Sequence, residues 1–282
     1  MAMRLLAILG WLLAFLAQPA AAATSPELIS LEQQLAGLVA GKSGEYGIAA
    51  LDLNTGKTVS INGDVAFPMA STVKLAVAAA YLTQVDYGRR TLDQTIGGKS
   101  AYSLLEAMLV RSDNYATDLL IHNLGGPKTV QQWVNWHGLS GISVDRTIAQ
   151  LLRDRRDLRD PRDSSTPMAM IELLKKIETG NVLKPQSRSF LQLMMARCIT
   201  GSNRIRALLP AGTRVEHKTG TLSGLTDDVG FITLPDGRRI AVAIFARGGN
   251  DRPRGIAEAA RTIYDGFTAT LRYPFVTAYG GR

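Results

Sequence analysis

The sequence is poor in the residues that stabilise folds through disulfides or metal ions. It contains one cysteine, Cys198, in 282 residues. An internal disulfide is therefore excluded, and the fold must depend on its apolar core. The three histidines, His122, His137 and His217, lack the spacing of metal ligands, so we expect no metal site and no cofactor. Cys198 lies in an apolar segment over 190–198 that is predicted to be helical, which favours a buried and inert thiol.

Long apolar runs are also scarce, and the only one that approaches the length of a membrane span lies at the N-terminus. Residues 1–23 combine one positive charge, Arg4, with an apolar stretch and a run of alanines at its end. This is typical of a secretory signal peptide that is cleaved near Ala22 or Ala23. An uncleaved membrane anchor is the alternative, but the run is short for a spanning helix. We therefore expect a periplasmic or secreted protein with no stable membrane insertion after cleavage.

Charge is modest, and no basic stripe is present. Charged residues make up 20% of the chain and apolar residues 46%, which suits a large core and argues against disorder. Removing residues 1–23 takes away Arg4 and lowers the net charge from +8 to +7. Outside the cytoplasm, that excess could meet anionic polymers such as cell wall. The densest charged run, residues 153–163, alternates in sign, so we expect a solvated, self-paired loop and no nucleic-acid partner.

Apolar periodicity predicts strands near both ends of the chain and helices between them. The fold class is α/β (α+β), with an antiparallel five-stranded sheet flanked by helices plus an all-helical lobe. The α/β lobe comprises residues 24–70 and 212–282, and the helical lobe residues 71–211. The predicted elements are a helix from Ser25-Pro26, a β-hairpin over 46–53 and 58–61, a helix over 75–82 that is buried on every side, a helix from Thr166-Pro167 to Gly180, strands over 214–219, 229–234 and 239–245, and a final helix over about 254–267.

A candidate nucleophile and base lie at the start of the buried helix. In Ser71-Thr72-Val73-Lys74, positions i and i+3 share a helix face, so the Lys74 amine can reach the Ser71 hydroxyl. A serine needs a base to remove its proton, and a lysine can serve if burial and nearby cations lower its pKa. The alternative is a lysine that extends to solvent from the helix end. However, a lysine on an apolar helix is costly to bury unless it has a role.

Ser112-Asp113-Asn114 lies between two predicted helices, over 104–111 and 115–124. Serine, aspartate and asparagine are the commonest N-caps, so this segment could be an ordinary helix start. In a catalytic site, Ser112 would relay a proton to the leaving group and Asn114 would bind a substrate amide.

Lys218-Thr219-Gly220-Thr221 lies on a predicted strand. Lys218 could hold a substrate carboxylate, and the backbone N–H that follows Gly220 could stabilise an oxyanion. Gly220 permits the close approach of a ligand. The alternative is an edge strand that a lysine protects from aggregation.

The order of the three motifs is more specific than any one of them. Ser-x-x-Lys, Ser-Asp-Asn and Lys-Thr-Gly in this order form the signature of class A β-lactamases and penicillin-binding proteins. The chain resembles the class A β-lactamase family over nearly its whole length after residue 23. The resemblance implies Ser71 as nucleophile, Lys74 and Ser112 in proton transfer, an oxyanion hole formed by the Ser71 and Thr221 N–H groups, and a substrate-binding set of Asn114, Lys218, Thr219, Gly220 and Thr221.

One departure from the family concerns hydrolysis of the acyl-enzyme. Family members carry a glutamate that activates the deacylating water in the loop before Arg162-Asp163. Counting forward from Asp145-Arg146 puts Ile148 there, and counting back from Arg162-Asp163 puts Gln150 at this deacylation-water position. Residues 147–170 contain no glutamate. Because a glutamine can orient a water but cannot accept its proton at neutral pH, we expect slow deacylation.

Three functions therefore remain open. The first is a periplasmic or secreted β-lactamase-like hydrolase, monomeric, acylated at Ser71 by a small-molecule β-lactam. The second is a peptidoglycan D,D-peptidase, which shares the motifs, lacks the loop glutamate and uses the lysine as base. The third is a penicillin-binding module without turnover. A Ser-His-Asp hydrolase is disfavoured, because the sequence contains no Gly-x-Ser-x-Gly motif.

The second departure generates a prediction about access to the site. The connection between Lys74 and Ser112 is shorter than usual in the family, so a segment that forms one wall of the cleft is absent. We expect bulky side chains on a β-lactam to slow acylation less than they do in a family member with a full-length connection. Acylation rates for a matched pair of small and bulky penicillins check this. Equal slowing in both proteins would contradict an open wall.

Overall fold

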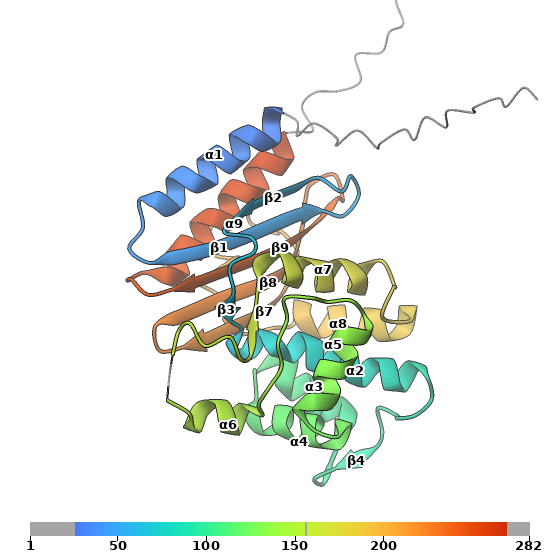
Figure 1. The fold of residues 1–282 in the computed structure, drawn as a ribbon. Helices are drawn as coiled ribbons and strands as arrows, with labels where there is room; N and C mark the ends of the chain where they lie inside the picture. Colours follow the sequence, from blue (N-terminus) through green and yellow to red (C-terminus); the bar gives the residue numbers. More distant parts are fainter. Residues whose placement is uncertain (1–25, 156, 270–282) are drawn as a thin grey trace, which may run out of the picture.

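The computed structural model describes residues 26–155 and 157–269, so the predicted signal peptide lies outside the described residues. Five strands form one antiparallel sheet, in the order β2-β1-β9-β8-β7 (Figure 1). The strands are β1 (Glu45–Asp52), β2 (Thr58–Ile61), β7 (Val215–Leu222), β8 (Leu225–Thr233) and β9 (Arg239–Arg247). The pairing of β1 with β9 joins an N-terminal strand to a C-terminal strand of the described chain. The predicted fold class and the predicted hairpin are therefore confirmed.

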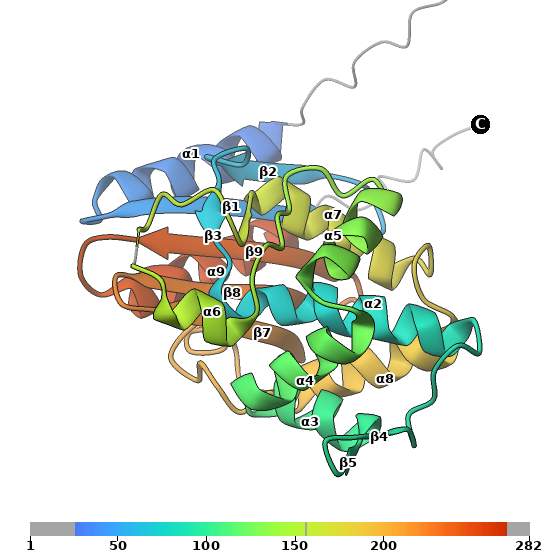
Figure 2. The same cartoon turned by 60° about the horizontal axis from the view of Figure 1, so that its bottom comes forward.

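Helices cover both faces of this sheet. On one face, α1 (Pro26–Ala40) and α9 (Arg252–Ala269) lie side by side (Figures 1 and 2). On the other face, α7 (Pro167–Glu178) packs against β1 and β9. The start of α7 follows from its sequence: the Thr166 hydroxyl accepts a hydrogen bond from the Ala169 N–H, and Pro167 occupies the first turn.

Most of the remaining helices pack against α2 (Lys74–Asp86), which follows the 3₁₀ turn η1 (Ala70–Val73). Every side chain from Leu75 to Leu82 is at most 3% exposed, which confirms the prediction of a helix buried on all sides. The other elements are β3 (Phe67–Pro68), β4 (Thr95–Ile96), β5 (Lys99–Ser100), α3 (Ala101–Val110), α4 (Asn114–Leu124), α5 (Pro127–Trp136), α6 (Ile148–Arg153), β6 (Ser164–Ser165) and α8 (Pro185–Ala196).

One hydrophobic cluster links the sheet with the helical part. It runs from Ala49 and Phe245 on the sheet, through Phe67, to Leu75 on α2 and Leu105 on α3. A second cluster fills the space between the sheet and the pair α1 and α9. The predicted division into two lobes stays a prediction. The larger cluster contains residues from both sides of the predicted boundary between residues 70 and 71. Within the described ranges, no helix has the length and apolar character needed to cross a membrane.

The contact between β7 and β8 generates a stability prediction. A Cβ atom at Gly230 of β8 would lie 2.0 Å from the Glu216 carbonyl oxygen and 2.6 Å from the His217 Cα. Backbone atoms cannot yield as side chains do, so we expect Gly230→Ala to lower the free energy of unfolding by about 3 kcal/mol. The matched control is Gly37→Ala in α1, where a Cβ would meet nothing within 4 Å.

The Gly37→Ala control should raise stability by about 1 kcal/mol, because alanine is the better helix former. Guanidinium denaturation of both variants measures the two changes. A Gly230→Ala variant as stable as the parent would mean that β7 and β8 can separate without cost.

Candidate active site

Ser71 lies in η1, at the entry to α2, and is half-buried. The preceding residue, Ala70, has a left-handed backbone with a φ of 44°. The turn is held from both sides: the Met69 N–H donates to the Asp163 carbonyl oxygen over 2.8 Å, and the Thr72 hydroxyl donates to the Met69 carbonyl oxygen over 2.7 Å. A non-glycine residue in this region of backbone space stores strain, which is concentrated at functional sites. The sequence alone gave no sign of this strain.

Lys74 is completely buried, one turn after Ser71. Its amine donates to the Ser112 carbonyl oxygen over 2.8 Å, to the Ser112 hydroxyl over 3.2 Å and to the Asn114 side-chain oxygen over 2.7 Å. Burial lowers the pKa of Lys74 to about 7, and the positive charge of Lys218 acts in the same direction. An amine with this pKa is partly neutral at neutral pH and can accept a proton.

The Ser112-Asp113-Asn114 segment combines a structural role with contacts to the site. The Asp113 carboxylate caps α4 by accepting the Ala116 N–H over 2.7 Å, so the ordinary-cap interpretation holds for this residue. Ser112 has a φ of 59°, a conformation that is uncommon for residues other than glycine. Its hydroxyl accepts hydrogen bonds from both Lys74 and Lys218. Ser112 therefore bridges the two lysines.

The Lys-Thr-Gly motif lies on β7, at the edge of the sheet. Lys218 is completely buried and donates to the Ser112 hydroxyl and to the Thr219 carbonyl oxygen, both over 2.9 Å. Its side chain therefore does not protect an exposed strand edge. Burial lowers the pKa of Lys218 to about 8. At neutral pH the group remains mostly charged and could hold an anionic substrate group.

Gly220 brings β7 against the turn that carries Ser71. A Cβ atom at this position would lie 2.7 Å from the Met69 carbonyl oxygen and 3.2 Å from the Ala70 Cβ. Only glycine permits this approach, because the Met69 carbonyl belongs to the backbone. The contact places the chain around Gly220 and Thr221 next to η1, as an oxyanion hole built from the Ser71 and Thr221 N–H groups requires.

Sequence reasoning missed Arg204, whose side chain binds residues of β7 and β8. Its guanidinium donates to the Gly220 carbonyl oxygen over 2.9 Å, to the Asp227 carbonyl oxygen over 2.8 Å and to the Thr221 hydroxyl over 2.6 Å. Arg204 belongs to no motif and lies outside the regular elements, so no local pattern marked it. Its role depends on the pairing of β7 with β8.

A chain of small polar groups also reaches the site. The Thr200 hydroxyl lies 2.6 Å from the Thr219 hydroxyl and 3.2 Å from the Cys198 sulfur. Cys198 is 4% exposed, which confirms its predicted burial. The cysteine therefore packs close to the Lys-Thr-Gly motif, which its sequence context did not indicate.

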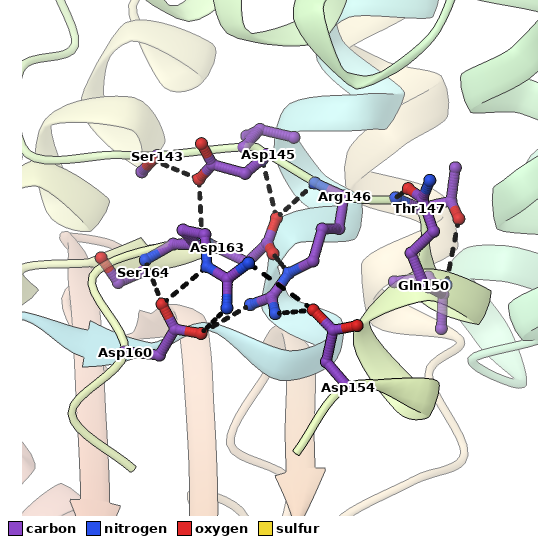
Figure 3. A network of polar contacts seen from close by, with 12 residues as sticks. Ser143, Asp145, Arg146, Thr147, Gln150, Asp154, Asp160, Asp163 and Ser164 are labelled. Carbon is purple, nitrogen blue, oxygen red and sulfur yellow. Dashed lines mark hydrogen bonds and ion pairs between the residues drawn. The ribbon is translucent and has the colours of Figure 1, made fainter. Parts of the chain in front are cut away.

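A network of ion pairs centred on Arg146 shapes the loop that follows α5 (Figure 3). The Arg146 guanidinium contacts Asp163 over 2.6 Å, Asp154 over 2.7 Å and Asp160 over 3.2 Å. Arg162 pairs with Asp160 as well, so the predicted pairing within the charged run is confirmed there. The centre of the network, however, is an arginine outside the run.

The two positions considered for the missing glutamate lie on α6. The Gln150 side chain completes a capping box: its oxygen accepts the Thr147 N–H over 2.9 Å, and the Thr147 hydroxyl accepts the Gln150 N–H over 3.2 Å (Figure 3). Gln150 is exposed, whereas the Ile148 side chain is 5% exposed and has no polar atom. To reach a water at the site, the Gln150 amide would have to leave the capping box. The assignment of Gln150 to the deacylation-water position stays a prediction.

Comparisons with known proteins agree with this geometry. A family model described as the β-lactamase enzyme family matches residues 30–267. The extended-spectrum β-lactamase PER-1 of Pseudomonas aeruginosa is 32% identical, over 86% of this chain and 88% of its own. The carbapenem-hydrolysing β-lactamase KPC of Klebsiella oxytoca is 31% identical, over 90% and 95%.

Solved structures of β-lactamases also superpose on this chain. The TLA-1 extended-spectrum β-lactamase superposes with a TM-score of 0.81 at 26% identity, covering 86% of this chain and 99% of its own. An ancestral class A β-lactamase superposes with a TM-score of 0.80 at 34% identity, covering 84% and 100%. The chain is a serine hydrolase that belongs to the class A β-lactamase family.

The Arg146 network generates a prediction for the loop. The side chains of Arg146 and Asp163 are 9% and 6% exposed. Removing the arginine side chain therefore leaves the buried Asp163 carboxylate without its ion-pair partner. We expect Arg146→Ala to lower the free energy of unfolding by about 3 kcal/mol. The matched control is Arg162→Ala, whose side chain is 52% exposed, and which should leave the denaturation midpoint almost unchanged. Equal losses in the two variants would show that Arg146 is not the centre of the network.

Proposed function

We propose that β-lactams acylate this protein at Ser71 and that the acyl-enzyme is hydrolysed slowly. The observation that carries the proposal is the buried amine of Lys74, held by Ser112 and Asn114 one turn from Ser71. Such an amine can take the Ser71 proton while the Ser71 oxygen attacks the β-lactam carbonyl carbon. The names of its relatives, which are β-lactamases, support the same substrate class.

In the proposed acylation, the proton moves from Ser71 to the leaving nitrogen. Lys74 accepts it, and Ser112, which contacts both lysines, passes it to the nitrogen as the amide C–N bond breaks. Lys218 and Thr219 would bind the substrate carboxylate, and Asn114 the side-chain amide. The N–H groups of Ser71 and Thr221 would stabilise the oxyanion.

Deacylation requires a base that activates water, and α6 offers none. Ile148 is apolar, and the Gln150 amide cannot accept a proton at neutral pH. Lys74 could then take the proton from water, as it takes the proton from Ser71. A D,D-peptidase that acts on peptidoglycan peptides would use the same lysine, and a penicillin-binding module would stop at the acyl-enzyme. We place the protein in the periplasm or outside the cell, as a monomer.

Mass spectrometry of the intact mature protein, sampled over time after mixing with penicillin, tests the proposal. We expect an adduct with the mass of the intact penicillin that forms quickly and decays slowly. Ser71→Ala should form no adduct, and Lys74→Ala should slow adduct formation ~10²–10⁴-fold, as expected for loss of a positioned base. The matched control is Ser30→Ala on α1, on the far side of the sheet, which should react as the parent does.

The decay of the adduct separates the candidate functions. Slow release of a hydrolysed penicillin supports the proposal, and Gln150→Glu should then accelerate it. An adduct that never decays indicates a binding module, and release of D-alanine from a peptidoglycan pentapeptide indicates the peptidase. An adduct that persists on Ser71→Ala would refute Ser71 as the nucleophile.

A further inference from the structure

Thr219, the threonine of the Lys-Thr-Gly motif, is held by the segment that follows α8. A Cβ atom at Gly201 would lie 2.5 Å from the Thr219 methyl carbon Cγ2, so this methyl group lies against the Gly201 backbone. The Thr219 hydroxyl lies 2.6 Å from the Thr200 hydroxyl. Because the methyl and the hydroxyl share one Cβ atom, the two contacts together fix the rotamer of Thr219. The hydroxyl oxygen is thus fixed in place, and the direction of its hydrogen remains to be set.

Backbone contacts anchor the segment that holds Thr219. The Cys198 N–H donates to the Met195 carbonyl oxygen of α8 over 3.2 Å. The Ile199 N–H donates to the Val110 carbonyl oxygen at the end of α3 over 3.1 Å. Gly201 has a φ of 72°, a conformation that favours glycine. The backbone therefore places this segment against β7, and a change of one small side chain within it need not move it.

Three polar groups in a row end at Thr219, and they can be hydrogen-bonded in two directions. The Thr200 hydroxyl lies between the Thr219 hydroxyl and the Cys198 sulfur, which is 3.2 Å away. In the outward direction, the Cys198 S–H donates to the Thr200 hydroxyl, which donates to the Thr219 hydroxyl. In the inward direction, both donors are reversed. Since a carboxylate only accepts hydrogen bonds, only the outward direction leaves the Thr219 hydrogen available to an anionic substrate group.

The chemistry of the three groups favours the outward direction. Sulfur is a weak acceptor, so the inward direction gives the Thr200 hydrogen a poor partner. It also leaves the S–H group with the Thr200 carbonyl oxygen, 3.9 Å from the sulfur. In the outward direction, the same S–H group reaches the Thr200 hydroxyl over 3.2 Å. Cys198 is 4% exposed, so water competes little for its hydrogen.

We propose that Cys198 is a positioning residue that acts through Thr200 and directs the hydroxyl hydrogen of Thr219 toward the substrate carboxylate. The inference rests on the role proposed above for Thr219 in binding that carboxylate. Lys218 supplies a positive charge for the same group, and the Thr219 hydroxyl supplies a directed hydrogen bond. Cys198 does not touch the substrate, so it acts on binding and not on the bond changes at Ser71. The competing explanation is a thiol that only fills space beside Thr200.

Infrared spectroscopy of the mature protein measures the direction of this chain. The protein has one cysteine, so its S–H stretching band, which lies in a region free of other protein bands, comes from Cys198 alone. A donating S–H group absorbs at a lower frequency than a free one. We expect the frequency to rise in Thr200→Val, which keeps the side-chain shape but removes the acceptor. The matched control, Thr262→Val on α9, makes the same change outside the site and should leave the band unchanged.

A second measurement separates substrate binding from the acylation step. Acylation by a chromogenic β-lactam over a range of concentrations gives a half-saturating concentration and a limiting rate. In Cys198→Ala, which lacks the donor, the half-saturating concentration should rise ~2–10-fold, as expected for the loss of one hydrogen bond. The limiting rate should stay near that of the parent. Cys198→Ser carries a hydroxyl donor at the same place and should restore the binding of the parent.

The outcomes separate this inference from its alternatives. An S–H band that Thr200→Val leaves unchanged would overturn it. Unchanged binding in Cys198→Ala, or equal losses in Cys198→Ala and Cys198→Ser, would do the same, because both variants remove the sulfur but only Cys198→Ala removes the donor. A parent protein that no β-lactam acylates would refute the proposed function, while the infrared band would still decide the direction of the chain.

Discussion

The structure depends on an amine that is buried without a formal counter-ion in contact. Lys74 is completely buried at the start of α2, whose side chains from Leu75 to Leu82 are all buried, and its three hydrogen-bond partners are neutral oxygens of Ser112 and Asn114. A buried ammonium is costly, so the group shifts toward its neutral form. The surrounding segments each supply part of the compensation: Ser112, just before α4, and Asn114, its first residue, contribute the oxygens, and the short strand β3 and the turn η1 fix the entry to α2. The same compensation leaves Lys74 able to exchange a proton near neutral pH.

The elements that carry the motifs could be predicted because their patterns are local. The unbroken apolar run from Leu75 to Leu82 indicated a central helix, and the turn residues after Asp52 indicated a hairpin. In contrast, the start of β8 was missed by four residues, because Asp227 and Asp228 disfavour a strand. Both are completely buried. Burial raises the pKa of Asp227 well above its ordinary value, and Asp228 accepts a hydrogen bond from His217 over 2.8 Å.

Local sequence patterns likewise predicted only part of the candidate site. Ser71, Lys74, Ser112 and Lys218 could be assigned from short motifs, and the structure brings Lys74, Ser112 and Lys218 into one hydrogen-bonded group. The contacts of Arg204 follow from the pairing of two strands, and the contact of the Asp118 carboxylate with the Ile148 N–H follows from the packing of α4 against α6. Such contacts join residues tens of positions apart, and no spacing rule describes them.

The position of β7 at the sheet edge leaves one side of its backbone without a partner strand. Within the described ranges, no strand pairs with the outer side of β7, so that side of the strand forms no ladder hydrogen bonds. An extended peptide can add to such an edge as a further strand, with its backbone held by main-chain hydrogen bonds. Because Gly220 fixes this edge against the turn that carries Ser71, an added strand would have its register set with respect to the hydroxyl. In such a complex, the amide opposite Gly220 and Thr221 would be the one nearest to the Ser71 hydroxyl.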